Sequence, residues 1–282
     1  MGIFQNKEQY EGYNIYSMKK YVDKKRMVFT IIAILAVIVT LSLTIYYLAD
    51  TTIRVKKSKE YAKQISEFEQ QRQETENKKK EEEEAERQAK IPKLTEQGKE
   101  NLKNIYHTEE KVAYLTFDDG PSNNTHEILD ILKKYNIKAT FFVLGSQVKV
   151  FPETTNRIYN EGHYIANHGY SHKYSNIYQS PEQVLNEFNQ CNQIVASTIN
   201  VPEYNSHLFR FPGGSVGGKY AELKSQAIAL LDQNNILHID WNSLTGDSEK
   251  TNPTEEYLMN NLQKTTEGKN SLVVLMHDAQ AK

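Results

Sequence analysis

The stretch that decides the fold is VAYLTFDDGP at positions 112–121. Six residues suited to a buried strand run directly into two adjacent aspartates, Asp118 and Asp119, and a Gly-Pro pair then turns the chain. Two neighbouring carboxylates at a strand end are costly unless a cation or a proton holds them together. The stretch predicts a strand whose end faces a reactive cavity, although an exposed turn can use the same residues.

Strand and helix patterns alternate around this stretch. Further strands are predicted at 140–144, 164–167, 208–211, 236–241 and 272–276, with helical stretches between them. One helix begins at Ser180-Pro181, and its apolar face includes Cys191, which we interpret as a packing residue. The alternation predicts an α/β domain with a parallel sheet, open or closed into a barrel, and chemistry at the carboxyl ends of its strands.

The N-terminal part has a different composition, because residues 27–49 contain no charged side chain. As a helix these residues reach about 34 Å, enough to cross a hydrocarbon core of about 30 Å. We expect a retained transmembrane helix, since the run is long and ends in bulky residues where a signal peptide needs small ones. Basic residues outnumber acidic ones in residues 1–26, which predicts a cytoplasmic tail and an extracellular location for the rest of the chain.

Residues 50–110 are predicted to form a charged helical stalk. Residues 51–110 hold 14 basic and 14 acidic side chains, and no Gly or Pro occurs between Thr51 and Lys90. A short apolar stripe at Tyr61, Ile65 and Phe68 is too brief for a coiled coil, so we expect a solvated spacer with at most weak self-association. The globular domain is expected at 111–282.

The composition of the chain excludes several classes of protein and one kind of metal site. The chain of 282 residues is 38% hydrophobic and 25% charged, which excludes a collagen, a wholly disordered chain and a polytopic membrane protein. A net charge of −2 gives no basic field for nucleic acid. The single cysteine provides neither an intrachain disulfide nor a thiolate zinc site, so any metal must be held by histidine and carboxylate.

A histidine pair follows the predicted strand at 164–167. His168 and His172 stand four residues apart in HGYSH, and together with the carboxylate pair they supply two imidazoles and a carboxylate. Hydrolytic zinc sites use this ligand set and keep one position open for water. Four other histidines have no such histidine and carboxylate partners and are expected to be structural, namely His126, His163, His207 and His238.

These segments resemble the polysaccharide deacetylases with a NodB-homology domain, carbohydrate esterase family 4. TFDDGP at 116–121 matches the first family motif letter for letter, HGYSH at 168–172 matches the second, RFPGG at 210–214 resembles the third and LMHD at 275–278 matches the fifth. The resemblance covers about residues 111–282. It implies a distorted (β/α) barrel, one divalent metal ion, usually Zn²⁺, and deacetylation of N-acetylglucosamine in peptidoglycan by a membrane-anchored enzyme.

The resemblance also implies roles for individual residues. Asp119, His168 and His172 would bind the metal, and Asp118, paired with Arg210, would be the general base. His277 would protonate the leaving amine. The backbone N–H of Gly213 would bind the oxyanion, Leu275 would contact the acetyl methyl group, and Trp241 is assigned to the substrate side.

Three departures from the family pattern stand out. Gly169 replaces a Ser or Thr whose hydroxyl would brace the metal-binding loop. The acidic residue that orients His277 is either Asp240, next to Trp241, or Asp247, and we favour Asp247 because it lies beyond the strand end. The sequence stops four residues after Asp278, so we expect a C-terminally short domain with the strand at 272–276 partly uncovered.

Other functions remain open on this evidence. They are a wall-binding module derived from an inactive deacetylase, a membrane scaffold acting through the stalk, and an O-acetyl esterase with the same catalytic residues. The sequence leaves open which N-acetylated glycan is the substrate; an outward-facing anchored domain favours the cell's own wall.

Overall fold

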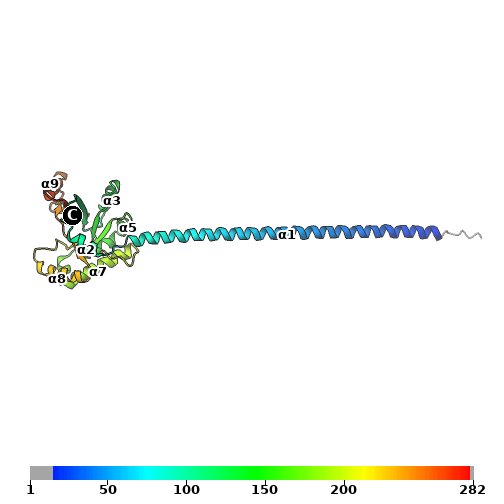
Figure 1. The fold of residues 1–282 in the computed structure, drawn as a ribbon, viewed down its shortest axis with the longest axis horizontal. Helices are drawn as coiled ribbons and strands as arrows, with labels where there is room; N and C mark the ends of the chain where they lie inside the picture. The colour runs from blue at the N-terminus through cyan, green and yellow to red at the C-terminus, as the bar shows by residue number, and fades with distance from the viewer. Residues whose placement is uncertain (1–14, 280–282) are drawn as a thin grey trace, which may run out of the picture. The chain divides into compact units, whose positions relative to one another are not determined.

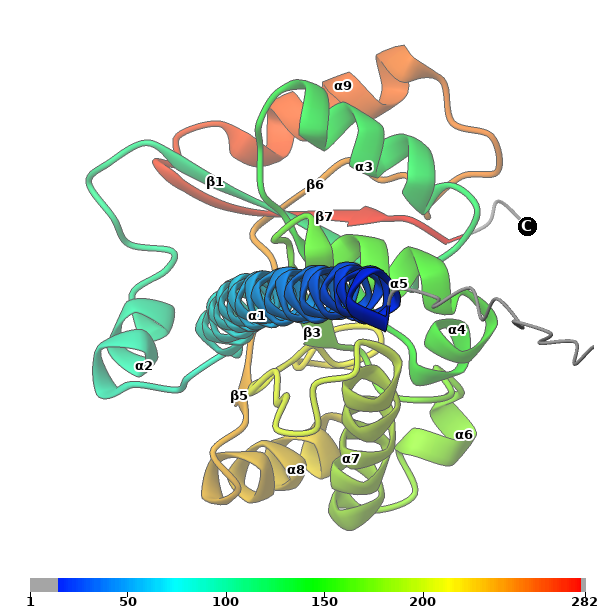
Figure 2. The ribbon, with the colours of Figure 1, turned by 90° about the vertical axis from the view of Figure 1, so that its right-hand side faces the viewer.

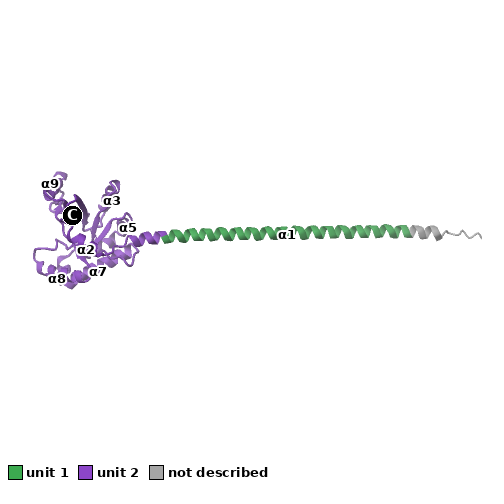
Figure 3. Cartoon of the chain, viewed as in Figure 1, with its two compact units in different colours: residues 1–81 green, residues 82–282 purple. Residues whose placement is uncertain are grey.

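The computed structural model describes the backbone of residues 15–279 and the side chains from residue 23 onward, and it divides the chain into two compact units. Figure 3 shows these units, residues 1–81 and residues 82–282. Helix α1 (Ile15–Ala89) supplies all of the described part of the first unit and ends just before Ile91-Pro92. Residues 1–14 of the predicted cytoplasmic tail lie outside the described residues.

The first unit carries the apolar run. Its large hydrophobic side chains between Met27 and Leu48 are exposed along α1. Among the described residues, α1 is the one helix long and apolar enough to cross a membrane. Beyond this run the helix is polar and carries ion pairs spaced four residues apart, such as Asp50 with Arg54 and Lys63 with Glu67. The apolar stripe at Tyr61, Ile65 and Phe68 is exposed.

The second unit is built on a parallel sheet, visible in Figures 1 and 2. Its strands have the order β5-β4-β3-β2-β1-β7-β6, and every described pair is parallel. Their bounds are β1 (Val112–Asp118), β2 (Thr140–Val143), β3 (Tyr164–Asn167), β4 (Leu208–Phe209), β5 (Leu237–His238), β6 (Ser243–Leu244) and β7 (Ser271–His277).

Helices follow most of these strands. Helix α7 begins where the sequence predicted, because Ser180 accepts a hydrogen bond from the backbone N–H of Gln183 and proline occupies the first helical position. The remaining bounds are α2 (Glu96–Lys103), α3 (Thr125–Lys134), α4 (Gly145–Val150), α5 (Pro152–Asn160), α6 (Tyr174–Ile177), α7 (Pro181–Thr198), α8 (Ala221–Gln233) and α9 (Glu255–Thr266).

The prediction of six strands missed β6. Only four residues separate β5 from β6, yet these two strands form opposite edges of the sheet. Six strand spacings of about 4.8 Å would put the edges of a flat sheet about 29 Å apart. Five extended residue steps reach at most about 18 Å, so the sheet has to curl until its edges approach each other. The result is a curled half-barrel, which agrees with the expected distorted barrel.

The two faces of the curled sheet are packed differently. Its outer face packs against helices through residues such as Phe117, Phe141 and Ile165, and buried Cys191 of α7 belongs to this core, as predicted. Figure 2 shows α3 and α9 near β1 and β7 at the top of the view, and α7 and α8 at the bottom. The inner face has a small core of its own, made of Phe142, Ala166, Ile239 and Val273.

Part of the predicted stalk belongs to the folded domain. Leu102, Ile105 and Tyr106 pack against the inner core, and Ser271 of β7 donates a hydrogen bond to the carbonyl of Ile105. The compact unit accordingly begins at residue 82 and not at 111. The count of charged residues did not reveal this contact, because the apolar side chains that pack against the inner core are few among the charged residues around them.

Strand β7 is not left uncovered, contrary to expectation. Val273, Val274 and Leu275 are all buried. Elements that precede β7 in the chain cover it: β1 and β6 flank it, and the segment around Ile105 packs on its inner face.

Candidate metal centre and active site

The predicted reactive residues meet at the carboxyl ends of β1, β3 and β7. Asp118 ends β1 and lies beside His277 of β7 in the register of the sheet. Asp119 follows Asp118 with a positive φ of 72°, which turns the backbone so that both carboxylates face the interior of the half-barrel. His168 follows β3 directly.

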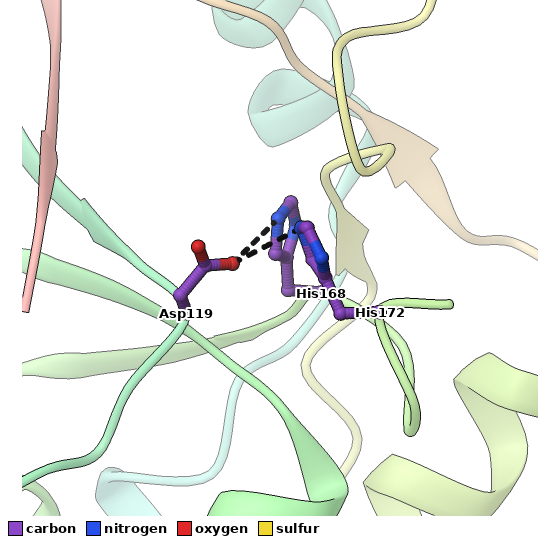
Figure 4. A group of neighbouring side chains, drawn as sticks. All are labelled: Asp119, His168 and His172. Carbon is purple, nitrogen blue, oxygen red and sulfur yellow. Dashed lines mark ion pairs between the residues drawn. The ribbon is translucent and has the colours of Figure 1, made fainter. Parts of the chain in front are cut away.

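Asp119, His168 and His172 form a compact cluster, drawn in Figure 4. Asp119 Oδ1 lies 3.4 Å from His168 Nε2 and 3.2 Å from His172 Nε2. One ligand atom from each of the three residues lies within 4.8 Å of the other two. Both imidazole rings therefore point the same nitrogen at one carboxylate oxygen.

The hydrogen bonds of this cluster fit a bound cation. His168 Nδ1 lies 2.7 Å from the carbonyl oxygen of Arg210, so this nitrogen carries the proton and Nε2 keeps its lone pair. Burial lowers the pKa of His168 to about 3, which keeps the ring neutral. Asp119 Oδ1 is buried without a hydrogen-bond partner among the described residues. Lone pairs that face each other in this way need a positive charge between them, and two imidazoles with one carboxylate suit zinc.

Glu187 braces the loop that carries both histidines. This side chain of α7 is buried and accepts hydrogen bonds from the backbone N–H groups of Tyr170 and Ser171, both at 2.7 Å, and from the Ser171 hydroxyl at 2.8 Å. The carboxylate of Glu187 thus braces this loop, which has no hydroxyl at position 169. Gly169 has a φ of +86°, and a Cβ there would lie 3.1 Å from Ile177, so this loop conformation favours glycine. Sequence reasoning missed Glu187, because only the fold brings α7 to this loop.

Asp118 is paired with Arg210 in the interior. Arg210 Nη1 donates to Asp118 Oδ1 at 2.8 Å and to the hydroxyl of Thr116 at 2.7 Å, and both charged side chains are buried. The guanidinium lies over the ring of Phe142, 3.9 Å from its centroid. Burial raises the pKa of Asp118, and the charge of Arg210 opposes that effect. A carboxylate of this kind is held in one orientation and retains basicity.

His277 contacts Asp247 and not Asp240. Asp247 accepts two hydrogen bonds from His277, one from Nδ1 at 2.9 Å and one from the backbone N–H at 2.7 Å. Burial lowers the pKa of His277, but the hydrogen bond and charge of Asp247 outweigh it, and the pKa lies above its ordinary value. Asp240 points elsewhere and accepts hydrogen bonds from the backbone N–H and hydroxyl of Ser215. Of the two residues considered from the sequence, only Asp247 reaches His277.

The loop that contains Gly213 is fixed on both sides of that residue. The hydroxyl of Tyr178 donates to the carbonyl of Pro212 at 2.6 Å, and buried Lys224 donates to the carbonyl of Gly214 at 2.6 Å. Gly213 itself is exposed and has a φ of +75°. Its backbone is therefore accessible from solvent while its neighbours are held in place. Tyr178 and Lys224 carried no sequence signal, since each lies in a separate helical stretch or turn.

The two remaining predicted residues lie on the same side of the half-barrel. Leu275 is buried on β7, two positions before His277, so both side chains face one side of that strand. Trp241 is half-buried, and the Arg210 guanidinium lies 5.7 Å from its ring centroid.

Asp278 is a buried carboxyl group that the sequence reading left without a role. It accepts a hydrogen bond from the hydroxyl of Thr125 at 2.6 Å, and burial raises its pKa to about 7. A Cβ at Gly120 would lie 2.1 Å from its carboxyl oxygen, so Asp278 occupies the space beneath the Asp-Asp-Gly turn. This contact explains why the turn needs glycine at position 120.

Known proteins share both the sequence and this fold. A family model described as polysaccharide deacetylase matches residues 106–229. A peptidoglycan-N-acetylglucosamine deacetylase of Bacillus cereus is 35% identical over 176 residues, which are 60% of this chain and 60% of the relative. A second B. cereus protein of that name is 30% identical over 170 residues, covering 60% of this chain and 73% of the relative.

A solved structure agrees with these relatives. The catalytic domain of peptidoglycan N-acetylglucosamine deacetylase from Eubacterium rectale superposes with a TM-score of 0.55 at 32% identity, covering 62% of this chain and 82% of that domain. The chain thus spans about 60% of the length of the first curated relative but most of a solved catalytic domain. With its curled parallel sheet and its motifs, the chain belongs to the polysaccharide deacetylase family.

Proposed function

We propose that this chain is a metal-dependent deacetylase that removes the acetyl group from N-acetylglucosamine residues of cell-wall peptidoglycan. The observation that supports this proposal most strongly is that one cluster of three residues and two residue pairs lie together at one end of the half-barrel. Asp119 lies with His168 and His172, Asp118 lies with Arg210, and His277 lies with Asp247. A ligand set, a base and an acid are the parts that amide hydrolysis requires.

Asp119, His168 and His172 would hold the metal. A bound divalent cation, for which this ligand set favours Zn²⁺, polarises the acetyl carbonyl and lowers the pKa of water. The chain's own residues perform the proton transfers. Asp118, held by Arg210, accepts the proton of the attacking water, because burial keeps its carboxylate more basic than an exposed aspartate.

The amide carbonyl oxygen gains negative charge when water adds to the carbonyl carbon. The backbone N–H of Gly213, an exposed residue, donates a hydrogen bond to that oxygen, and the fixed carbonyls of its two neighbours keep the N–H in place. Leu275 contributes the apolar surface for the acetyl methyl group, and Trp241 forms part of the substrate side.

His277 donates a proton to the amine nitrogen as the C–N bond breaks. An amine leaves poorly as an anion, so this step needs a protonated acid. Asp247 stabilises the protonated imidazole and keeps it available near neutral pH. The products are acetate and a glucosamine residue that remains within the glycan.

The wall is the substrate best supported for this chain. Its relatives in B. cereus and E. rectale are named as peptidoglycan N-acetylglucosamine deacetylases. The apolar part of α1 fits a single membrane anchor at residues 27–49, with the basic N-terminal side in the cytoplasm. An outward-facing anchored domain favours the cell's own wall as the substrate.

The test is acetate release by the full-length protein in detergent micelles. Purified peptidoglycan and an acetylated xylan are supplied separately with added Zn²⁺, and mass spectrometry follows the muropeptides. Loss of the acetyl mass from N-acetylglucosamine supports the proposal. Loss confined to N-acetylmuramic acid moves the substrate to the other wall sugar. Release from xylan alone identifies an O-acetyl esterase, and no release from either glycan refutes the enzymatic function.

A further inference from the structure

Tyr174 lies at the rim of the candidate site without a part in the chemistry described so far. It begins α6, two residues after His172, and its ring centroid is 6.0 Å from that of His172. The side chain is 41% exposed. A large aromatic residue next to a metal-ligand candidate is therefore open to solvent.

The hydroxyl of Tyr174 lies directly against Gly213. A Cβ at position 213 would be 2.2 Å from this oxygen, which means that the phenol fills the space a side chain there would need. Gly213 is the residue whose N–H is proposed to bind the carbonyl oxygen. Tyr174 thus lies between the metal-ligand loop and the oxyanion loop and borders the place where the acetylated sugar has to enter.

The ring is held in that position by two other tyrosines. Tyr178 meets it in a T-shaped contact at 5.4 Å, and Tyr220 meets it at 6.3 Å. Tyr178 is itself buried and hydrogen-bonded to the loop at Pro212. The phenol of Tyr174 is consequently positioned before any substrate arrives.

The hydroxyl of Tyr174 differs from those of structural tyrosines in the same domain. Buried Tyr178 and Tyr204 donate to backbone carbonyls, each at 2.6 Å. Within the described residues the Tyr174 hydroxyl makes no hydrogen bond to the protein, although its ring is fixed by aromatic contacts. A fixed aromatic ring with a free donor suits a sugar, whose surface presents C–H groups beside hydroxyl oxygens.

We propose that Tyr174 is a substrate-binding residue whose hydroxyl donates a hydrogen bond to an oxygen of the N-acetylated sugar bound beside Gly213. This inference rests on the proposed function, because it takes an N-acetylated glycan as the ligand. It assigns to α6 a direct part in sugar recognition and leaves the proton transfers to Asp118 and His277.

The test compares the full-length wild type with Tyr174→Phe in detergent micelles, using a pentamer of N-acetylglucosamine as the probe. A hydrogen bond between neutral groups contributes about 0.5–1.5 kcal/mol, which corresponds to a rise of about 2- to 12-fold in KM. We expect that rise in Tyr174→Phe, with kcat, zinc content and melting temperature unchanged. Tyr135→Phe, which removes the hydroxyl of an exposed tyrosine at the end of α3, is the matched control and should behave as wild type.

Two results would overturn the inference. An unchanged KM in Tyr174→Phe shows that the hydroxyl does not bind the sugar. A fall in kcat at unchanged KM places the hydroxyl on the reacting atoms instead. If the wild type does not turn the pentamer over, the peptidoglycan assay decides the proposed function separately, and calorimetric Kd values for the same pentamer then decide the role of Tyr174.

Discussion

Replacing Asp247 by Asn tests how the candidate acid is kept protonated. The carboxylate accepts a hydrogen bond from His277 Nδ1 at 2.9 Å, and the pKa of His277 lies above its ordinary value because of it. Hydrogen bonds to charged groups contribute about 1.5–3 kcal/mol and neutral ones about 0.5–1.5, so the protonated imidazole loses about 1–2 kcal/mol of stabilisation. At 1.36 kcal/mol per unit, the pKa of His277 should fall by about one unit.

The sign of the effect on activity follows from the role of His277. A general acid works while it is protonated, so activity is lost as pH rises through its pKa. A lower pKa moves the alkaline limb of the pH profile of kcat/KM about one unit toward acid, and the rate above that limb falls about tenfold. Acetate release between pH 5 and pH 10 measures the limb, and NMR titration of the His277 ring measures the pKa directly.

Asp240→Asn is the matched control for this experiment. Asp240 holds Ser215 and makes no hydrogen bond to His277, so its substitution should lower the rate without moving the alkaline limb. An unmoved limb in Asp247→Asn, or an equal movement in Asp240→Asn, would refute the assignment of Asp247.

Three further substitutions probe the same site. His168→Ala should remove bound zinc, as measured by elemental mass spectrometry, whereas exposed His107→Ala should retain it; full zinc occupancy in the first variant contradicts the ligand set. Asp118→Asn should keep the metal and lose a factor of about 10²–10⁴ in kcat, and a wild-type rate excludes Asp118 as the base. Glu187→Gln should cost about 1–3 kcal/mol in urea unfolding and weaken zinc binding, because a buried carboxylate with three donors loses its charge; unchanged stability and zinc affinity would show that the brace is dispensable.

Much of the fold could be predicted because its signals are local. The uncharged run at 27–49, the Ser180-Pro181 helix start and the strand at 112–117 are each readable from neighbouring residues alone. Strand β6 was not predicted because its two residues are too few to show a periodic pattern, and its place in the sheet depends on pairing with β7. The folded part of 82–110 was not predicted for a similar reason, since the packing role of Leu102 and Ile105 is evident only once the inner core they contact is known.

The residues of the candidate site also divide into those that the sequence predicts and those that only the structure identifies. Asp118, Asp119, His168 and His172 stood out because each follows a predicted strand, and the ends of parallel strands meet at one edge. The partner of His277 was predicted less firmly: Asp247 was favoured over Asp240 because it lies beyond the strand end, and the direction of each side chain decides between them.

The sequence by itself determined the alternation of strands and helices, the apolar N-terminal helix and the chemical types gathered at the strand ends, because these depend on periodicity and on residue identity. The tertiary structure decided the curl of the sheet, through a four-residue connection between its two edges. It also decided which distant side chains complete the site: Glu187 beneath the histidine loop, Asp247 behind His277 and Tyr174 against Gly213. Such pairings join residues far apart in the chain, and only packing fixes the directions in which their side chains meet.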